Sequence, residues 1–295
     1  HDMRPVFRSV QANRKWTRIR SPVKFSKSDG VCTLYFEHAV EFDNDKIYFA
    51  FTYPYTYTMV QDDIETIKRH NNDFTAEDDS LYMHHEVLTK SVDGRNVDLI
   101  TITSIGGADC EKREPLLSGI FPEHSADGSM RPPTFPDKEV IFLSARVHPG
   151  EVPAQWTFKG MLDLLRDKTD LRAIELRRHF VFKLIPLLNP DGVFRGHFRM
   201  DQFGNNLNRY YTAPDPTNQP TIFAAKVLLD YYSDKKLLSA YVDCHAHASK
   251  RGCFIYGNVM DSLDDQVQNQ LYCQLISMNT PHFDYEGCLF SKEHM

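Results

Sequence analysis

Residues 140–151 read Val-Ile-Phe-Leu-Ser-Ala-Arg-Val-His-Pro-Gly-Glu. The apolar run from Val140 to Ala145 suits a strand that is buried on both faces of a parallel sheet. A helix with an apolar stripe is expected from about Pro153. The polar corner between them therefore follows the carboxyl end of a core strand, which is where ligands gather in α/β sheets.

The same alternation of strands and helices extends over most of the chain. Apolar runs predict further strands at 97–103, 180–188, 240–244 and 254–256. Helical periodicity predicts helices at 59–70, 221–232 and 263–278. The proline-containing segment 106–138 is expected to be a long loop. We therefore expect an α/β fold with a mixed, mostly parallel sheet flanked by helices.

The first 58 residues have a different pattern. Two alternating runs, 32–36 and 47–51, predict strands, and Tyr53-Pro-Tyr-Thr-Tyr57 follows as an aromatic segment typical of an interface. We expect residues 1–58 to be the C-terminal part of an N-terminal β-sandwich domain, and residues 59–295 to form one larger domain. Because both chain ends look cut, we expect a piece of a longer protein whose larger domain is truncated at its C-terminal end.

The composition narrows the class of protein. A chain of 295 residues, 41% of them hydrophobic, can bury a sizeable core. The net charge of −6 argues against general nucleic-acid binding. The six cysteines include no Cys-x-x-Cys pair and are typical of reduced thiols in an intracellular protein. No apolar run reaches the roughly 18–20 residues that span a bilayer, so we expect neither nucleic acid nor membrane as a partner.

His148 and Glu151 lie three residues apart at the polar corner. A neutral imidazole and a carboxylate are both good zinc ligands. The alternative is a turn followed by a helix N-terminus, where the helix dipole favours glutamate.

A second predicted strand ends in Asp243-Cys-His-Ala-His247. Two histidines and one glutamate, with water in the fourth position, form a known catalytic zinc set. His245 and His247 would share a face on a continuing strand, so the spacing leaves the choice between them open. Asp243 either orients a ligand or ends the strand.

Two arginines follow the turn signal Asn189-Pro-Asp-Gly192. Arg199 and Arg209 lie in a polar stretch after a core strand. A planar guanidinium binds carboxylate in a bidentate manner, as a site that selects a free C-terminus requires. The alternative is that both are solvated loop arginines.

The ordered series of these motifs resembles the zinc carboxypeptidase (funnelin) superfamily. The series is His148-Pro-Gly-Glu151, Asn189-Pro-Asp-Gly192 with Arg199, Asn208-Arg209 and His245. Finer features are similar to the cytosolic carboxypeptidases within it, namely the aromatic segment 53–57 and the runs 182–192, 195–199, 244–253 and 282–288. The resemblance covers nearly the whole chain.

The resemblance implies the zinc carboxypeptidase fold and one Zn²⁺ per chain. It makes His148, Glu151 and His245 the zinc ligands and so prefers His245 to His247. Arg199 would polarise the scissile carbonyl. Asn208 and Arg209 would bind the terminal carboxylate of the substrate.

The family removes glutamate from polyglutamylated tubulin tails and other acidic C-termini, and one member type acts on branch-point glutamate. The resemblance therefore implies tubulin or another acidic protein as partner, attracted in part by Lys250 and Arg251. It implies a cytoplasmic location, with microtubules, cilia or the nucleus as further sites. The general-base glutamate of the family belongs to a later Tyr-Thr-x-Glu segment that this chain does not reach, and Glu286 and Glu293 lack that context.

Two rival functions share parts of this pattern. A zinc amidohydrolase of N-acyl amino acids would share the His-x-x-Glu motif and a later histidine. A non-catalytic tubulin-tail binding module would keep the metal site and the arginines without turnover.

Overall fold

The computed structural model describes residues 4–12, 15–70, 72–74, 77–124 and 128–291. Glu293 and both chain ends lie outside these residues. The chain divides into two compact units, His1–His245 and Ala246–Met295, each of which is described by itself. In the described part of the chain, no helix is both long enough and apolar enough to cross a membrane.

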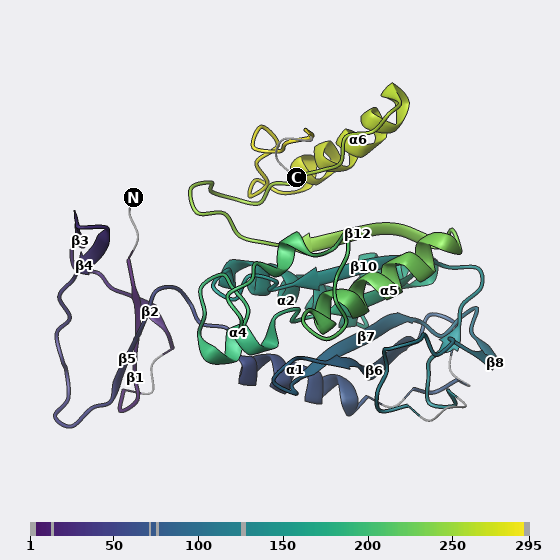
Figure 1. The fold of residues 1–295 in the computed structure, drawn as a ribbon, viewed down its shortest axis with the longest axis horizontal. Helices are drawn as coiled ribbons and strands as arrows, with labels where there is room; N and C mark the ends of the chain where they lie inside the picture. The colour runs from purple at the N-terminus through teal and green to yellow at the C-terminus, as the bar shows by residue number, and fades with distance from the viewer. Residues whose placement is uncertain (1–3, 13–14, 71, 75–76, 125–127, 292–295) are drawn as a thin grey trace. The chain divides into compact units, whose positions relative to one another are not determined.

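A five-stranded mixed sheet forms the centre of the first unit (Figure 1). Its order is β12 (Leu238–Cys244), β10 (Glu139–Ala145), β11 (Phe180–Ile185), β7 (Asn96–Ser104) and β6 (Leu81–Lys90). Strand β10 is parallel to both β11 and β12, whereas β7 is antiparallel to both β11 and β6. Four of the five strands therefore point the same way, as the sequence predicted.

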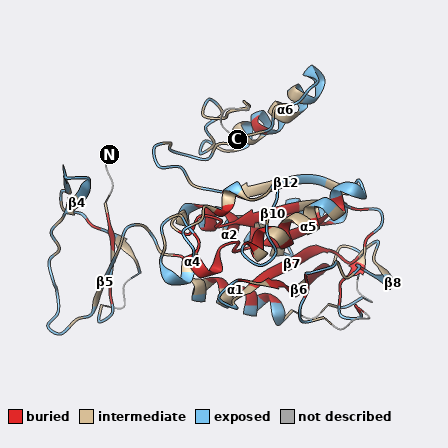
Figure 2. Cartoon of the chain, in the orientation of Figure 1, coloured by how far each residue is buried: buried red, intermediate tan, exposed pale blue. Residues whose placement is uncertain are grey.

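Helices cover both faces of this sheet. The buried side chains of α1 (Tyr57–Lys68) and α2 (Val152–Arg166) pack with one set of strand residues. Those of α5 (Pro220–Asp234) pack with the alternate set on the opposite face. Both cores appear as the red interior of Figure 2. Burying one large aliphatic side chain contributes roughly 1.5–3 kcal/mol, so these two layers hold the strands in place. The predicted α/β fold with flanking helices is confirmed.

Several elements differ from the sequence-based expectation. The segment 106–138 contains the short strands β8 (Asp109–Arg113) and β9 (Pro133–Thr134), so it is not only loop. The predicted strand at 254–256 is wrong, because only isolated bridges form at Cys253 and Tyr256.

Two helices were not expected. One is α3 (Leu171–His179), whose buried Arg177 donates from Nη1 to two backbone oxygens at 2.8 Å each. The other is α4 (Pro190–Arg195), which stands where the sequence predicted a turn. The side chain of Asn189 caps α4 at its Gly192 N–H, and Pro190 occupies the first turn, where no N–H is needed.

Between Val6 and Ala50, the described residues include two small antiparallel sheets. One contains β2 (Thr17–Arg18), β1 (Val6–Ser9) and β5 (Ile47–Ala50), and the other is the hairpin of β3 (Lys24–Ser28) and β4 (Val31–Tyr35). The expected domain boundary at residue 58 stays a prediction.

The aromatic segment that follows lies against α2. The ring of Tyr55 is 4% exposed and meets the ring of Trp156 edge-on at 4.8 Å. The indole N–H of Trp156 donates to the carbonyl of Tyr53 at 3.2 Å. This segment is therefore tied to the helix that begins at the polar corner.

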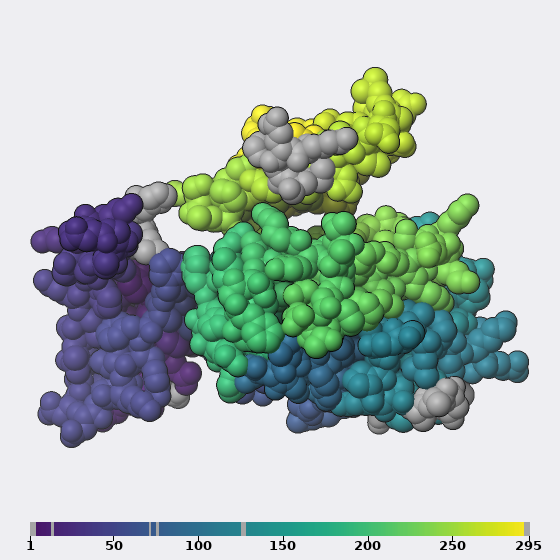
Figure 3. All heavy atoms as spheres, in the orientation of Figure 1, coloured from purple at the N-terminus to yellow at the C-terminus, as the bar shows by residue number. Residues whose placement is uncertain are grey.

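The second unit contains α6 (Leu263–Asn279) and appears as the yellow-green to yellow part of Figure 3. Within it, Lys250 Nζ donates to the carbonyl of Gly287 at 2.6 Å and lies over the rings of Phe254 and Tyr256. Lys250 thus stabilises the fold of this unit.

Candidate metal centre

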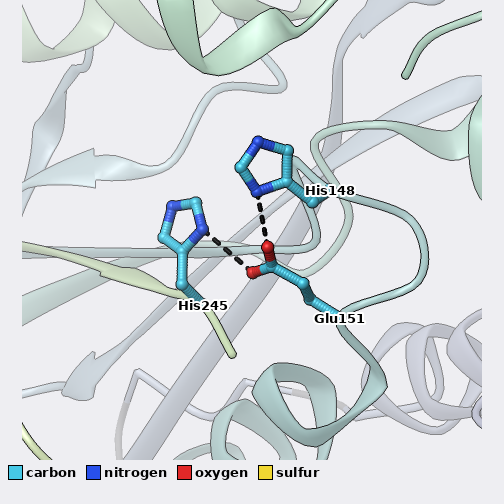
Figure 4. A group of neighbouring side chains, drawn as sticks. All are labelled: His148, Glu151 and His245. Carbon is cyan, nitrogen blue, oxygen red and sulfur yellow. Dashed lines mark hydrogen bonds and ion pairs between the residues drawn. The ribbon is translucent and has the colours of Figure 1, made fainter. Parts of the chain in front are cut away.

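Three side chains converge at the carboxyl end of the central sheet. His148 follows β10, Glu151 is the residue before α2, and His245 follows β12. Strands β10 and β12 are parallel neighbours with Ala145 opposite Cys244, so they end at the same level. One potential ligand atom from each of the three residues lies within 4.8 Å of the others (Figure 4). The sheet therefore brings together residues that are 94 positions apart in sequence.

The corner that carries His148 and Glu151 is held by a buried arginine. Arg146 is 3% exposed, has a positive φ of 59°, and donates from Nε and Nη2 to the carbonyl of Pro149 at 3.0 and 2.7 Å. Its Nη1 donates to the carbonyl of Tyr55 at 3.1 Å. Burial lowers the pKa of Arg146 to about 10, although the charge of Glu151 opposes this. Arg146 therefore stays charged and fixes the corner against the aromatic segment.

Hydrogen bonds at Asn206 determine which nitrogen of His148 carries the proton. Asn206 Oδ1 accepts from the backbone N–H of Asn208 at 3.2 Å and lies 2.9 Å from His148 Nε2. Because Oδ1 is an acceptor, Nε2 must donate. The other nitrogen, Nδ1, lies 2.8 Å from Glu151 Oε1. Nδ1 is buried and has no hydrogen-bond partner among the described residues.

His245 lies between two carboxylates. Its Nε2 is 2.8 Å from Asp243 Oδ2, and its Nδ1 is 3.1 Å from Glu151 Oε2. Desolvation lowers the pKa of His245, but hydrogen bonds to Asp243 and Glu151 and their charges outweigh it and raise the pKa to about 9. The site thus attracts positive charge to the point that Nδ1 faces.

These observations test whether the three residues fit a zinc ion. Two imidazole nitrogens and one carboxylate, the donor set typical of a catalytic zinc site, face one point. His148 Nδ1 is buried, has no hydrogen-bond partner among the described residues and lies 2.8 Å from Glu151 Oε1, so a cation held at this point would be its partner. Asn206 and Asp243 hold the outer nitrogens, as partners of metal-bound histidines commonly do. The residues fit the ion.

His247, the rival ligand, forms hydrogen bonds within its own loop. Its Nδ1 accepts from the backbone N–H groups of Ser249 and Lys250, at 3.2 Å each. It belongs to the second unit, where its ring also contacts those of Phe254 and Tyr256.

The predicted substrate residues lie on the segment that follows α4. Arg199 Nη1 is 3.4 Å from Glu151 Oε1, and 42% of its side chain is exposed. Asn208 and Arg209 belong to the single-turn helix η1 (Leu207–Arg209). Arg209 is exposed, and no carboxylate of a described residue forms an ion pair with it. Both guanidinium groups are therefore accessible to a ligand.

Several residues of the site escaped the sequence interpretation. In the sequence, no periodicity or motif distinguishes Asn206, Ser144 or Tyr211. Ser144 Oγ donates to Asp243 Oδ1 at 2.6 Å and lies 3.0 Å from the hydroxyl of Tyr241. Burial, followed by the charge of Asp243, raises the pKa of Tyr211 well above its usual range. A register of parallel strands, which sequence alone does not supply, brings these groups together.

Residues 71–249 match the family described as zinc carboxypeptidase, and the chain belongs to this family. The chain is 36% identical to cytosolic carboxypeptidase-like protein 5 of Mus musculus, over 99% of the chain and 43% of that protein. It is 34% identical to cytosolic carboxypeptidase 6 of Mus musculus, over 84% of the chain and 41% of that protein. The chain thus spans less than half of the length of either relative.

A solved structure shares the fold. The metallo-carboxypeptidase from Burkholderia cenocepacia superposes with a TM-score of 0.72 and 22% identity, covering 99% of this chain and 65% of that chain. The predicted resemblance to the zinc carboxypeptidases is therefore confirmed for family and fold.

Proposed function

We propose that this protein is a zinc-dependent metallocarboxypeptidase that removes glutamate from acidic protein C-termini such as polyglutamylated tubulin tails. The observation that carries the proposal is the convergence of His148, Glu151 and His245 within 4.8 Å, with the partly exposed Arg199 lying 3.4 Å from Glu151. The names of the relatives support a cytosolic location. Residues 1–58 would close an N-terminal β-sandwich domain, and the residues from 59 onward would form the peptidase domain.

His148 and His245 would bind one Zn²⁺ through Nδ1, and Glu151 through its carboxylate. A bound Zn²⁺ supplies a water whose pKa is lowered from about 16 to about 7. The protein orients the ligands for this task, because Asn206 and Asp243 hold the outer nitrogen of each imidazole.

The arginines have separate roles in this proposal. Arg199, next to Glu151, would donate to the oxygen of the scissile carbonyl as negative charge develops there. Losing one such donor typically raises the barrier by roughly 3–4 kcal/mol. Arg209, with Asn208 beside it, would bind the terminal carboxylate of the substrate, since a guanidinium matches a carboxylate with two parallel hydrogen bonds.

An acidic substrate agrees with the charges at the site. Arg209 lacks an ion-pair partner among the described residues, and Arg199 pairs with Glu151, itself a proposed metal ligand. A glutamate-rich tail would find there the guanidinium group of Arg209 and the partly exposed guanidinium group of Arg199. The preference for glutamate, including branch-point glutamate, rests on the resemblance to the cytosolic carboxypeptidases.

The test uses the full-length protein with polyglutamylated tubulin peptides, in forms with a free and with an amidated C-terminus. Mass spectrometry should detect zinc-dependent loss of glutamate from the free form only. Arg209→Ala should weaken binding of the free form far more than of the amidated form, whereas Arg172→Ala, an exposed arginine on α3, should change neither.

Three outcomes would overturn the proposal. Equal loss of both peptide forms in Arg209→Ala would contradict the carboxylate role. Cleavage of N-acyl amino acids without release of glutamate would indicate an amidohydrolase. Zinc-dependent binding of the tails without any release of glutamate would indicate a binding module.

A further inference from the structure

The segment from Asn206 to Tyr211 is attached at both ends to groups that hold the two imidazoles of the metal centre. At its start, Asn206 Oδ1 accepts from His148 Nε2 at 2.9 Å and also from the backbone N–H of Asn208 at 3.2 Å. One oxygen thus fixes both the first histidine and the first turn of η1.

At its end, the segment reaches the second histidine through a chain of hydrogen bonds. The hydroxyl of Tyr211 lies 3.2 Å from that of Tyr241, which lies 3.0 Å from Ser144 Oγ. Ser144 Oγ donates to Asp243 Oδ1 at 2.6 Å. The other oxygen of Asp243 lies 2.8 Å from His245 Nε2.

The sheet makes this chain of contacts rigid. Ser144 on β10 is directly opposite Asp243 on β12, and Phe142 is opposite Tyr241. Between the two attachments, the buried side chain of Leu207 anchors η1 in the hydrophobic core. Asn208 and Arg209 are the residues held between them.

We propose that Tyr211 is a positioning residue that couples the metal centre to the carboxylate-binding segment, so that the bound metal orders Asn208 and Arg209. This inference rests on the proposed function, because it needs the metal at His148 and His245 and the substrate carboxylate at Arg209.

The coupling follows from the polarity of the imidazoles. A cation on Nδ1 withdraws electron density from the ring, and Nε2–H becomes a stronger donor to Asn206 and to Asp243. Hydrogen bonds in such chains strengthen one another. Linkage then requires the reverse effect: a ligand that orders the segment must tighten metal binding by the same factor.

Hydrogen exchange of the segment tests the proposal directly. The reporters are the backbone amides of Asn208, Arg209 and Tyr210, which donate to Asn206 Oδ1, to the carbonyl of Asn206 and to that of Leu207. Zinc added to the metal-free protein should slow their exchange by about 5-fold or more. Tyr211→Phe should lose most of this protection while still holding one zinc by metal analysis.

The chain offers a matched control. Tyr210 lies in the same segment, and its hydroxyl donates to Asn205 Oδ1 at 3.3 Å, a contact that leads to neither His148 nor His245 through hydrogen bonds of the described residues. Tyr210→Phe should keep the zinc-induced protection of the wild type. Equal protection in Tyr211→Phe and the wild type, or no zinc-induced protection in the wild type, would overturn the proposal.

A second readout separates coupling from a merely structural role. The affinity of a glutamate-ended peptide with a free C-terminus should fall several-fold in zinc-loaded Tyr211→Phe, and it should equal that of the wild type when both are metal-free. Weakening that is the same with and without zinc would show a structural role and overturn the coupling. Absence of bound zinc, or absence of preference for the free C-terminus, would instead refute the proposed function.

Discussion

Gly150 leaves no room for a side chain, and Gly150→Ala should damage the site through its neighbour Arg199. An added Cβ would lie 2.5 Å from the carbonyl oxygen of Phe198 and 3.1 Å from its Cα. Ordinary contact begins near 3.4 Å, so the backbone that carries Arg199 would have to move by about 0.9 Å (3.4 − 2.5). That movement would also break the hydrogen bond from Gly150 N to Phe198 O, now 2.7 Å long.

Gly150→Ala should lower the free energy of unfolding in two ways. Overpacking typically costs about 1–3 kcal/mol, and the lost hydrogen bond adds about 0.5–1.5 kcal/mol. A displacement of roughly 1 Å at a catalytic group lowers the rate by about 10²-fold. The free energy of unfolding, from urea titrations, should therefore fall by about 1.5–4.5 kcal/mol. Glutamate release by the zinc-loaded full-length protein should fall by about 10²-fold.

Gly160→Ala is the matched control. A Cβ at this position in α2 meets no atom within 4 Å, and alanine favours a helix over glycine by about 0.5–1 kcal/mol. This variant should be slightly more stable than the wild type and equally active. The reasoning is refuted if Gly150→Ala matches Gly160→Ala in both measurements.

Two further predictions concern stability. Burial and the nearby charges of Lys183 and Arg131 lower the pKa of His84 from 6.5 to about 3. Between these pH values the unfolded chain binds more protons than the folded one, so the free energy of unfolding falls as the pH decreases through that window. When the pH is lowered from 7 to 5, the free energy of unfolding of His84→Gln, from denaturant titrations, should therefore fall by about 2 kcal/mol less than that of the wild type. Asp191 is 2% exposed and accepts hydrogen bonds from Ser91 Oγ at 2.7 Å and Arg95 Nη1 at 2.8 Å. Asp191→Ala should therefore lower the free energy of unfolding by about 3–5 kcal/mol. Asp230→Ala removes an exposed ion pair with Lys226 and should lower the free energy of unfolding by less than about 1 kcal/mol. A similar decrease in both variants would contradict the assigned role of Asp191.

Sequence patterns predicted the core of the fold because central strands such as β7 and β10 are buried on both faces, whereas β12 at the edge of the sheet is largely exposed. The runs at 97–103, 140–145 and 240–244 agree with β7, β10 and β12 within a few residues at each end. Buried parallel strands read as continuous apolar runs, and this signal needs no knowledge of their neighbours.

The misses occur where polar groups replace the apolar signal. Helix α3 carries few apolar residues and is fixed by the backbone contacts of Arg177. Asn189-Pro-Asp-Gly192 is chemically suited to a turn and equally to a helix start, and tertiary contacts of Asp191 select the helix. At 254–256, an apolar run of three residues is too short to distinguish a strand from a bridged loop.

The candidate site stays a prediction, and only part of it follows from local sequence. The corner residues His148 and Glu151 follow from one strand and one helix, so local sequence identifies them. The choice between His245 and His247 depends on where the chain turns after β12, and the hydrogen bonds that occupy His247 Nδ1 are visible only in the structure.

Zinc stoichiometry in four proteins tests the central claim most directly. The wild type and His247→Ala should each hold one zinc per chain after dialysis against zinc-free buffer, measured by atomic absorption. His148→Ala and His245→Ala should hold none, because two remaining ligands form a weak site. Retention of one zinc by His245→Ala, together with its loss from His247→Ala, would contradict the proposed metal centre.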